Sequence, residues 1–412
     1  MHALRSSRLQ GPVITALALF ALLIVFGPGW SKREDTSLQH DAYIWHRSWN
    51  AALKSAIESN KDLVSGWRVL AAQARPDGRL VATAVDKAVL QGSQLPVVLV
   101  VRIDGQLRNF GSAHLQADIL TLYRLWAADS FHVAGIEIDY DCATSRLPEY
   151  SRFLAELRSN LDAKARLSVT ALPAWLTSPA LPDLLRHLDD SVLQVHSVEH
   201  PGSGSLFDPR KARQWIDRYA EISPRGFRVA LPTYGSRVGF DDYGNLSFVE
   251  SETSLGRGSA TSRELTAPPQ AVKELLDYMK RSAPKNLLGY AWFRLPTEAD
   301  QRAWSAATWR ALVLGQPLTP QPRIEARATQ DPRLFDLVLI NPGPTDVALP
   351  SRVQLPTSCT DADGANEYEP TTAAGRIALS RAHPSLLRPG SDLSLGWARC
   401  VSNPTRELYG QT

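Results

Sequence analysis

The chain has 412 residues, a formal net charge of +3 and 44% hydrophobic residues. This length allows one large domain and a smaller one, and the apolar fraction is that of a globular protein. Outside the amino terminus the sequence has no basic stripe, so we expect no nucleic acid partner. The 11 tryptophans are a high count, and surplus tryptophans often stack on sugars or other flat ligands.

Residues 1–30 have the pattern of an export segment. Basic residues in MHALRSSR precede an apolar run at 12–26, which is shorter than a transmembrane helix requires and is typical of a signal peptide. No small-x-small cleavage site follows, so an uncleaved signal anchor is the alternative. We expect the protein to be periplasmic, or anchored in the inner membrane facing the periplasm, with this segment as its only membrane contact.

Strand and helix patterns alternate through the middle of the chain. The predicted strands are 42–49, 62–72, 95–104, 133–141, 166–175, 191–200, 227–235 and 287–295. The predicted helices are 49–58, 112–128, 148–163, 179–188, 209–220, 268–281 and 299–313. This alternation predicts an α/β fold, a (β/α)8 TIM barrel over residues 40–314. A doubly wound open sheet is the alternative, but its Gly-rich turn after the first strand is absent. The long segment 235–266 predicts a hairpin inserted over the carboxyl end of the barrel.

A small antiparallel β domain is predicted for residues 324–412. It follows a Pro-rich boundary at 314–323 and alternates apolar and polar residues between strong turn signals. We interpret it as a sandwich-like accessory domain that either binds carbohydrate or only packs on the barrel. Cys359 and Cys400 both lie in it and are expected to pair in an oxidising compartment, which leaves Cys142 as a free thiol.

The most informative stretch is VAGIEIDYD, residues 133–141. Glu137, Asp139 and Asp141 alternate with apolar residues, so they share one face of a strand. An exposed strand with a solvated acidic face would give the same pattern. Because helical patterns flank the strand on both sides, we favour a buried barrel strand whose acids serve a function.

Chemistry in a barrel lies at the carboxyl ends of the strands. Polar and aromatic residues gather at several of the other predicted strand ends. These candidate pocket residues are Trp45, Arg102, His196, Glu199, Tyr234, Arg237, Trp292 and Arg294.

His196, Glu199 and His200 also fit the H-x-x-E-H pattern of inverted zinc proteases. That chemistry needs a helix, whereas here a strand pattern precedes the motif and Pro201 follows it. We therefore interpret His196 as a pocket residue or a satisfied core histidine. We expect neither a metal nor a cofactor.

The segment GIEIDYD resembles the fourth-strand signature of glycoside hydrolase family 18, the chitinases. LPTYGSR, residues 231–237, and GYAWFRL, residues 289–295, resemble later strands of that family. The chain as a whole looks still more like a bacterial family of exported proteins of unknown function with a related barrel. That second resemblance is carried by GIEIDYD together with the helix YSRFLAELR and the strand SVTALPAW.

The resemblance implies that Asp141 is the proton donor, that Glu137 and Asp139 support it, and that Trp292 floors a sugar subsite. Tyr234 would bind the acetamide of an N-acetyl sugar or stabilise developing charge. The chain departs from the chitinases in two places, because their donor is Glu and their first acid is replaced by Ala134.

From the residues alone, Glu137 has a structural alternative as a partner of Arg102 on the adjacent strand. A substrate without an N-acetyl group would need a second carboxylate, and Glu199 or Asp104 are candidates. We expect a glycoside hydrolase that acts on an extracytoplasmic polysaccharide or oligosaccharide by general acid catalysis. The alternative is a degenerate barrel that binds glycan or an envelope partner without turnover.

Overall fold

The computed structural model describes residues 38–105, 107, 110, 113–129, 132–197, 206–251 and 261–408. The predicted export segment therefore lies outside the described residues. Residues Gln39–Thr412 form one compact unit. Within the described ranges, no helix is long and apolar enough to cross a membrane.

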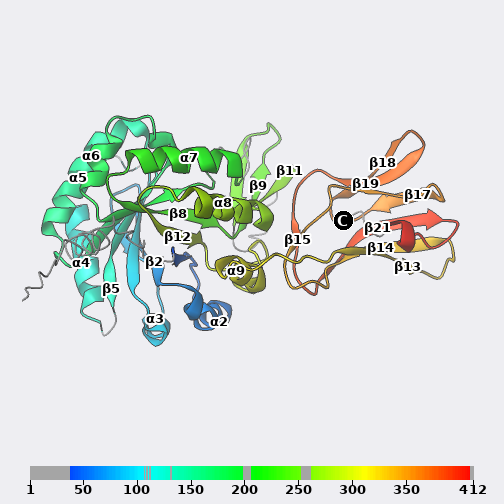
Figure 1. Cartoon of the computed structure of the whole chain (residues 1–412), viewed down its shortest axis with the longest axis horizontal. Helices are drawn as coiled ribbons and strands as arrows, with labels where there is room; N and C mark the ends of the chain where they lie inside the picture. The colour runs from blue at the N-terminus through cyan, green and yellow to red at the C-terminus, as the bar shows by residue number, and fades with distance from the viewer. Residues whose placement is uncertain are drawn as a thin grey trace, which may run out of the picture. The chain divides into compact units, whose positions relative to one another are not determined.

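Eight parallel strands close into a barrel (Figure 1). They are β1 (Gln39–Ile44), β2 (Gly66–Ala74), β4 (Val97–Ile103), β5 (Val133–Tyr140), β6 (Arg166–Ala171), β7 (Asp190–Gln194), β8 (Gly226–Pro232) and β12 (Leu287–Phe293). Each strand pairs with its neighbours in parallel, and β1 closes the ring by pairing with both β12 and β2. The predicted barrel is confirmed, and the open-sheet alternative is wrong.

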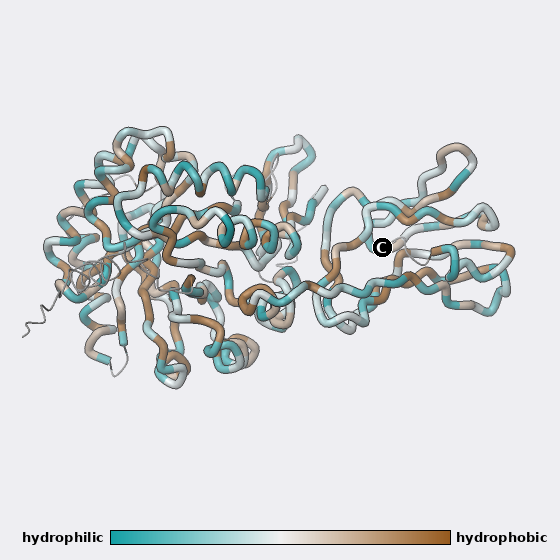
Figure 2. Tube along the Cα trace, in the orientation of Figure 1, coloured by the Kyte–Doolittle hydropathy of each residue, from teal (hydrophilic) through white to brown (hydrophobic). Residues whose placement is uncertain are grey.

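Helices cover the outside of the barrel. They are α2 (Ala51–Asn60), α3 (Lys87–Ser93), α4 (Ala113–Ala127), α5 (Leu147–Asn160), α6 (Leu181–Arg186), α7 (Pro209–Ile222), α8 (Pro269–Ser282) and α9 (Ala306–Val313), with single 3-10 turns η1 (Lys61–Leu63), η2 (Thr144–Arg146) and η3 (Pro173–Trp175). Capping side chains start several of them, as when Asn50 Oδ1 accepts from Leu53 N at 3.0 Å. In Figure 2 the helices change between teal and brown along their length, as expected for helices with one face on the sheet.

Several elements differ from the sequence prediction. The strand predicted at 42–49 ends at Ile44, the one predicted at 166–175 ends at Ala171, and the one predicted at 191–200 ends at Gln194. The hairpin strand β3 (Leu80–Ala82) and helix α3 were not predicted, since both are short. The helix predicted at 299–313 begins only at Ala306, because Ser305 caps it by accepting from Thr308 N.

The insertion after β8 is a small antiparallel sheet. The predicted hairpin is present as β9 (Gly235–Phe240) and β10 (Leu246–Glu250), and β11 (Thr261–Thr266) adds a third strand on the other side of β9. The side chain of Asp241 accepts from Tyr243 N and Asn245 N, which fixes the turn between β9 and β10. The sheet starts at the carboxyl end of β8, where barrel enzymes carry their pockets.

The carboxy-terminal residues form antiparallel sheets. The strands are β13 (Arg323–Ala328), β14 (Leu334–Ile340), β15 (Val347–Ala348), β16 (Arg352–Gln354), β17 (Cys359–Gly364), β18 (Tyr368–Ala373), β19 (Arg376–Arg381), β20 (Leu386–Leu387) and β21 (Asp392–Cys400), followed by α10 (Thr405–Leu408). A four-stranded sheet, β13-β14-β21-β17, and a three-stranded sheet, β16-β19-β18, share one apolar core. This confirms the small β domain after the barrel.

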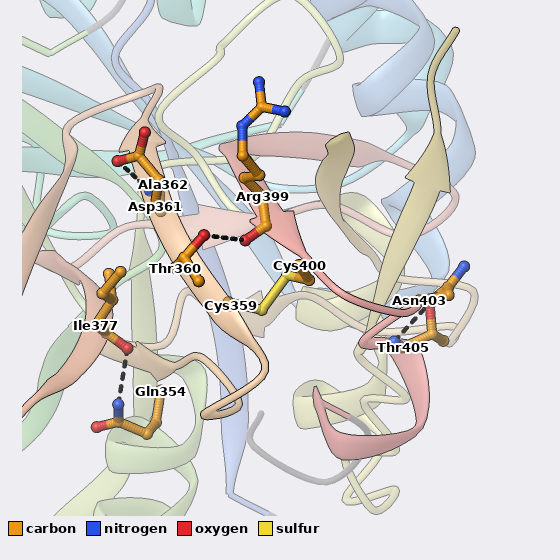
Figure 3. The surroundings of a disulfide bond; sticks show 10 residues. All are labelled: Gln354, Cys359, Thr360, Asp361, Ala362, Ile377, Arg399, Cys400, Asn403 and Thr405. Carbon is orange, nitrogen blue, oxygen red and sulfur yellow. Dashed lines mark hydrogen bonds between the residues drawn. A yellow bond between two sulfur atoms is a disulfide. The ribbon is translucent and has the colours of Figure 1, made fainter. Parts of the chain in front are cut away.

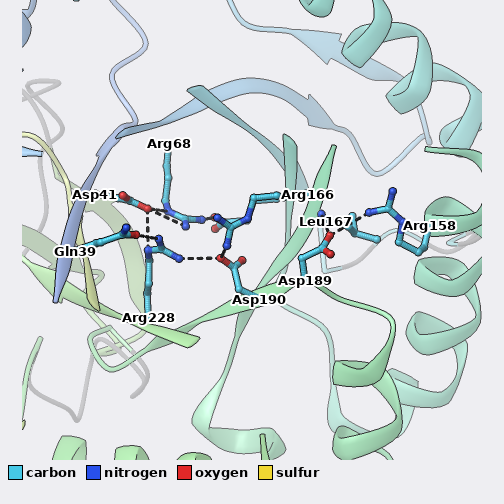
Figure 4. A network of polar contacts seen from close by, with 10 residues as sticks. Gln39, Asp41, Arg68, Arg158, Arg166, Leu167, Asp189, Asp190 and Arg228 are labelled. Atoms are coloured by element: carbon cyan, nitrogen blue, oxygen red, sulfur yellow. Dashed lines mark hydrogen bonds and ion pairs between the residues drawn. The ribbon is translucent and has the colours of Figure 1, made fainter. Parts of the chain in front are cut away.

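The interior of the barrel is charged near its amino-terminal end. TIM barrels are normally filled by branched apolar side chains, and one such layer is present here around Val100, Val192 and Ala291. Below it, Arg68 and Arg228 are buried and pair with Asp41 and Asp190 (Figure 4). Four buried charges in one layer are stable only because each is paired.

The predicted disulfide joins β17 to β21. Cys359 and Cys400 are bonded, with their Cα atoms 3.9 Å apart, where the two strands lie side by side (Figure 3). The third cysteine, Cys142, is free and buried just after β5.

Thiol titration of the denatured, unreduced protein is expected to find one thiol, that of Cys142. Replacing both Cys359 and Cys400 with Ser opens a covalent loop of 41 residues and should lower the free energy of unfolding of the β domain by about 4 kcal/mol in the chain-entropy model. Denaturant unfolding measures this loss. Three titratable thiols, or a double variant as stable as the parent, would contradict the disulfide.

Candidate functional site

A pocket of about 200 Å³ lies at the carboxyl ends of the barrel strands. Six of the residues proposed from the sequence line it, namely Trp45, Arg102, Asp139, Asp141, His196 and Tyr234. Further lining residues are Tyr43, Thr170, Gln194, Ser197, Ala230 and Phe293. The fold thus collects polar and aromatic side chains from β1, β4, β5, β6, β7, β8 and β12.

Two carboxylates and one arginine form the centre of the pocket. Asp139 is the last but one residue of β5, and Asp141 follows two positions later, so both face the barrel interior. Arg102 on the adjacent strand is in register with Asp139. Its Nη1 donates to Asp139 Oδ2 at 2.8 Å, and its Nη2 donates to Asp141 Oδ2 at 3.0 Å.

The two acids differ in exposure. The Asp139 side chain is 7% exposed, whereas the Asp141 side chain is 39% exposed. Burial, together with the negative charge of Asp141, raises the pKa of Asp139 to about 7, although Arg102 opposes the shift. A buried acid that exchanges its proton near neutral pH therefore lies beside an acid that a ligand can reach.

Glu137 lies beneath the pocket and does not line it. Its side chain is fully buried and accepts from Tyr43 Oη at 2.5 Å and Thr170 Oγ1 at 2.8 Å. It also forms an ion pair with Arg68. The alternative pairing of Glu137 with Arg102 is therefore wrong. Glu137 acts on the pocket through Tyr43 and Thr170, whose orientations it fixes.

Aromatic rings form one wall of the pocket. Phe293, at the end of β12, has its ring centroid 5.2 Å from that of Trp45 and 5.5 Å from that of Tyr43. The guanidinium carbon of Arg102 lies 5.9 Å from the Trp45 ring centroid, within range of a cation–π contact. Flat apolar rings beside charged groups are a combination that suits sugar rings.

His196 and Tyr234 lie next to Phe293 in the same pocket. Tyr234 Oη lies 3.4 Å from His196 Nδ1, and the His196 ring stacks on Phe293 at 5.3 Å. Burial lowers the pKa of His196 to about 3 and raises the pKa of Tyr234 to about 12, so both are neutral at pH 7. His196 bridges to Phe207 and is not helical, as the zinc-protease pattern would require. Among the described residues, no group of three His, Cys, Asp or Glu is placed to hold a metal ion.

Trp292 is not a pocket residue, and the prediction that it floors a sugar subsite is wrong. Its side chain is fully buried, its Nε1 lies 3.0 Å from His40 Nδ1, and its ring packs against Trp304 and Trp309. Side chains alternate along β12, so Phe293 faces the pocket and Trp292 faces outward.

Arg294 and Arg237 are also outside the pocket. Arg294 is buried, pairs with Asp300 and donates to the Ser251 carbonyl oxygen at 2.6 Å. Arg237 lies in the inserted sheet, where its Nε donates to Ser262 Oγ at 3.2 Å. Neither arginine lines the pocket; Arg294 is buried away from it, whereas substrate binding by Arg237 stays a prediction. Glu199 lies outside the described residues, and Asp104 does not line the pocket.

Several pocket residues were missed although strand alternation points to some of them. Tyr43 is two positions before Trp45, so it lies on the same face as its predicted neighbour. Nothing in the sequence marks Ser197, which adopts a φ of 52° after β7.

Solved structures with the same barrel fold include two enzymes. A chitinase from Chromobacterium violaceum is 16% identical with a TM-score of 0.50, over 68% of this chain and 100% of that one. The spore cortex-lytic enzyme SleL from Bacillus megaterium is 12% identical with a TM-score of 0.51, over 68% of this chain and 75% of that one. At these identities the likeness shows the fold alone.

No curated protein matches the chain. Residues 324–401 match the family described as Domain of unknown function (DUF8456). Residues 93–298, which are half of the chain and include six of the eight barrel strands in full, match the family described as Domain of unknown function (DUF3142). The chain therefore belongs to the DUF3142 family and carries a barrel of the chitinase-like fold.

Proposed function

We propose that this protein is a glycoside hydrolase that acts on an extracytoplasmic polysaccharide, with Asp141 as the general acid. The observation that carries the proposal is the pair Asp139 and Asp141 in the pocket at the carboxyl end of the barrel. The raised pKa of Asp139 supports it, because a glycosidase needs a carboxyl group that holds a proton near neutral pH. The fold shared with a chitinase is consistent with this class of reaction.

Each side chain has a defined part in the proposed reaction. Asp141 gives its proton to the glycosidic oxygen as the bond to the anomeric carbon breaks, and Asp139 supplies and takes back a proton beside it. Trp45 and Phe293 stack on the sugar ring, and the Tyr234 hydroxyl donates to an acetamide oxygen. If that acetamide oxygen attacks the anomeric carbon, no second catalytic carboxylate is needed. Water then attacks the anomeric carbon, breaks its bond to the acetamide oxygen and gives a proton to the Asp141 carboxylate, which restores the acid.

Glycan binding without turnover is the second candidate function, and one contact favours it. Arg102 donates to Asp141 Oδ2 at 3.0 Å, so one of the two oxygens that could carry the donated proton already accepts a hydrogen bond from a cation. Asp is also one methylene shorter than the Glu of chitinases. Displacement of that size costs on the order of 100-fold in rate when the pocket does not compensate.

We further propose that the protein works in the periplasm, either free or anchored in the inner membrane. The basic and then apolar amino terminus supports export. The Cys359–Cys400 disulfide supports an oxidising compartment.

The first test replaces Asp141 with Asn in the full chain. Hydrolysis of chitin oligosaccharides, peptidoglycan and biofilm polysaccharides is measured as release of reducing sugar. The substrate that the parent cleaves should be cleaved at least about 100-fold more slowly by the variant, because a positioned general acid contributes that much. Asp183→Asn, an exposed acid on α6 paired with Arg186, is the matched control and should keep full activity.

Glycan binding separates the two candidate functions. Trp45→Ala should weaken binding through lost stacking area in either case, whereas Trp292→Ala should lower stability without acting on the pocket directly. A protein that binds glycan through Trp45 but shows no hydrolysis that depends on Asp141 is a binding module. Unfolding of Asp141→Asn would mean that the acidic strand is structural.

The second test uses the pH dependence of stability. A carboxyl whose pKa is raised from 3.8 to about 7 on folding stabilises the native state most below about pH 4, and this contribution is lost as pH rises to 7. We therefore compare the free energy of unfolding of Asp139→Asn with that of the parent. The variant's value minus the parent's should be larger at pH 8 than at pH 5, by a few kcal/mol. Thermal unfolding at both pH values checks this, with Asp183→Asn as the control. An equal difference at both pH values would contradict the raised pKa.

The third test concerns localisation. Residues 1–40 are fused to a reporter that is active only after export, and the fusion should be active. The same fusion without the apolar run at 12–26 should be inactive. An inactive parent fusion, with the full chain in the soluble cytosolic fraction, would refute export.

A further inference from the structure

A second cavity of about 290 Å³ opens at the amino-terminal end of the barrel. It is lined by the first residues of the strands, so it lies at the opposite end from the candidate active site. Its wall includes the charged groups Asp41, Arg68, Lys164, Arg166, Asp190 and Arg228. No residue is shared with the first pocket, and the proposed hydrolysis uses none of these groups.

Positive charge exceeds negative charge in this cavity. The wall holds four cationic side chains and two carboxylates. Asp190 pairs with both Arg166 and Arg228, and Asp41 pairs with both Arg68 and Arg228, so each carboxylate is shared (Figure 4). Glu137 adds one further negative charge to Arg68 from the layer above. The four cationic side chains therefore face three carboxylates, which leaves a net charge of +1.

The excess charge lies on the solvent side of the cavity. The Arg166 side chain is 47% exposed, and Lys164 stands exposed in the turn before β6, without an ion pair to any described residue. Arg68 and Arg228, in contrast, are fully enclosed. An anion that enters from solvent therefore meets two accessible cations at the mouth and an arginine layer at the bottom.

The cavity also contains hydrogen-bond donors without acceptors. Ser168 faces the barrel interior, since Thr170 two positions later donates to Glu137, and its buried hydroxyl has no hydrogen-bond partner. Arg228 Nε is buried and also has no hydrogen bond, although it forms an ion pair with Asp41 Oδ2 at 3.0 Å. Buried donors of this kind are costly unless an acceptor reaches them.

We propose that this amino-terminal cavity is a binding site for a small oxyanion, a phosphate or sulfate group. Such an ion supplies the missing negative charge and several acceptor oxygens at once. Guanidinium groups match these oxygens in geometry, and charge-assisted hydrogen bonds of this kind are the strong ones. The proposal does not depend on the proposed hydrolysis, which takes place at the other end of the barrel.

The test is calorimetric titration of the purified full chain with inorganic phosphate and with sulfate, at an ionic strength held constant with sodium chloride. We expect saturable binding with one site per chain. Arg166→Gln should weaken the binding by about tenfold or more, since it removes a charged hydrogen-bond donor. Lys164→Gln and Ser168→Ala should weaken it by smaller factors. Thermal unfolding shows whether each variant is folded.

Arg102→Gln is the matched control. Arg102 also bridges two carboxylates and is partly exposed, but it lies at the carboxyl end of the barrel, so the variant should bind phosphate like the parent. Absence of saturable binding to the parent overturns the proposal. So does unchanged binding by a folded Arg166→Gln, or binding that Arg102→Gln abolishes. Acetate that binds as tightly as phosphate would overturn the assignment to a tetrahedral oxyanion.

Discussion

The buried ion pair between Arg68 and Glu137 is the contact on which both ends of the barrel depend. Arg68 belongs to β2 and Glu137 to β5, with β4 between them, so the pair crosses the barrel interior. Neither charge is tolerable there alone, because an unpaired ion in a protein interior costs several kcal/mol. Arg68 also pairs with Asp41 below, and Glu137 accepts from Tyr43 above. One interaction thus connects the charged amino-terminal layer to the wall of the candidate active site.

This connection explains why a barrel strand keeps three acids on one face. Glu137 is neutralised by Arg68, and Asp139 and Asp141 share Arg102. Each acid therefore has a cation, yet only the last two reach the pocket. The role of each acid thus follows its depth in the barrel. Glu137, the deepest, is structural, whereas Asp141, nearest the mouth of the pocket, is accessible to a ligand.

Most of the fold was predictable because strand and helix patterns alternate clearly along the chain. All eight barrel strands, the inserted hairpin and the β domain were placed from local pattern and turn signals. The errors concern which way a side chain points and what it meets across the barrel. In β12 both faces are apolar, so alternation could not tell Trp292 from Phe293, and the family resemblance chose the wrong one. Arg68 is a single charged residue in an otherwise apolar strand. No local sequence pattern indicates that it forms an ion pair with Glu137 on a strand two positions away in the sheet.

The shared arginine of the pocket has a thermodynamic consequence. Arg102 holds Asp139 and Asp141 with two different nitrogens, and its charge lowers the pKa of Asp139, so the position of the guanidinium and the proton affinity of Asp139 are linked. A ligand that draws Arg102 away removes the positive charge that opposes the raised pKa of Asp139, so Asp139 should then take up a proton. Ligand binding in the pocket then favours protonation of Asp139, and protonation of Asp139 favours ligand binding to the same extent, as linked equilibria require. The heat released when this pocket fills will therefore vary with the ionisation enthalpy of the buffer.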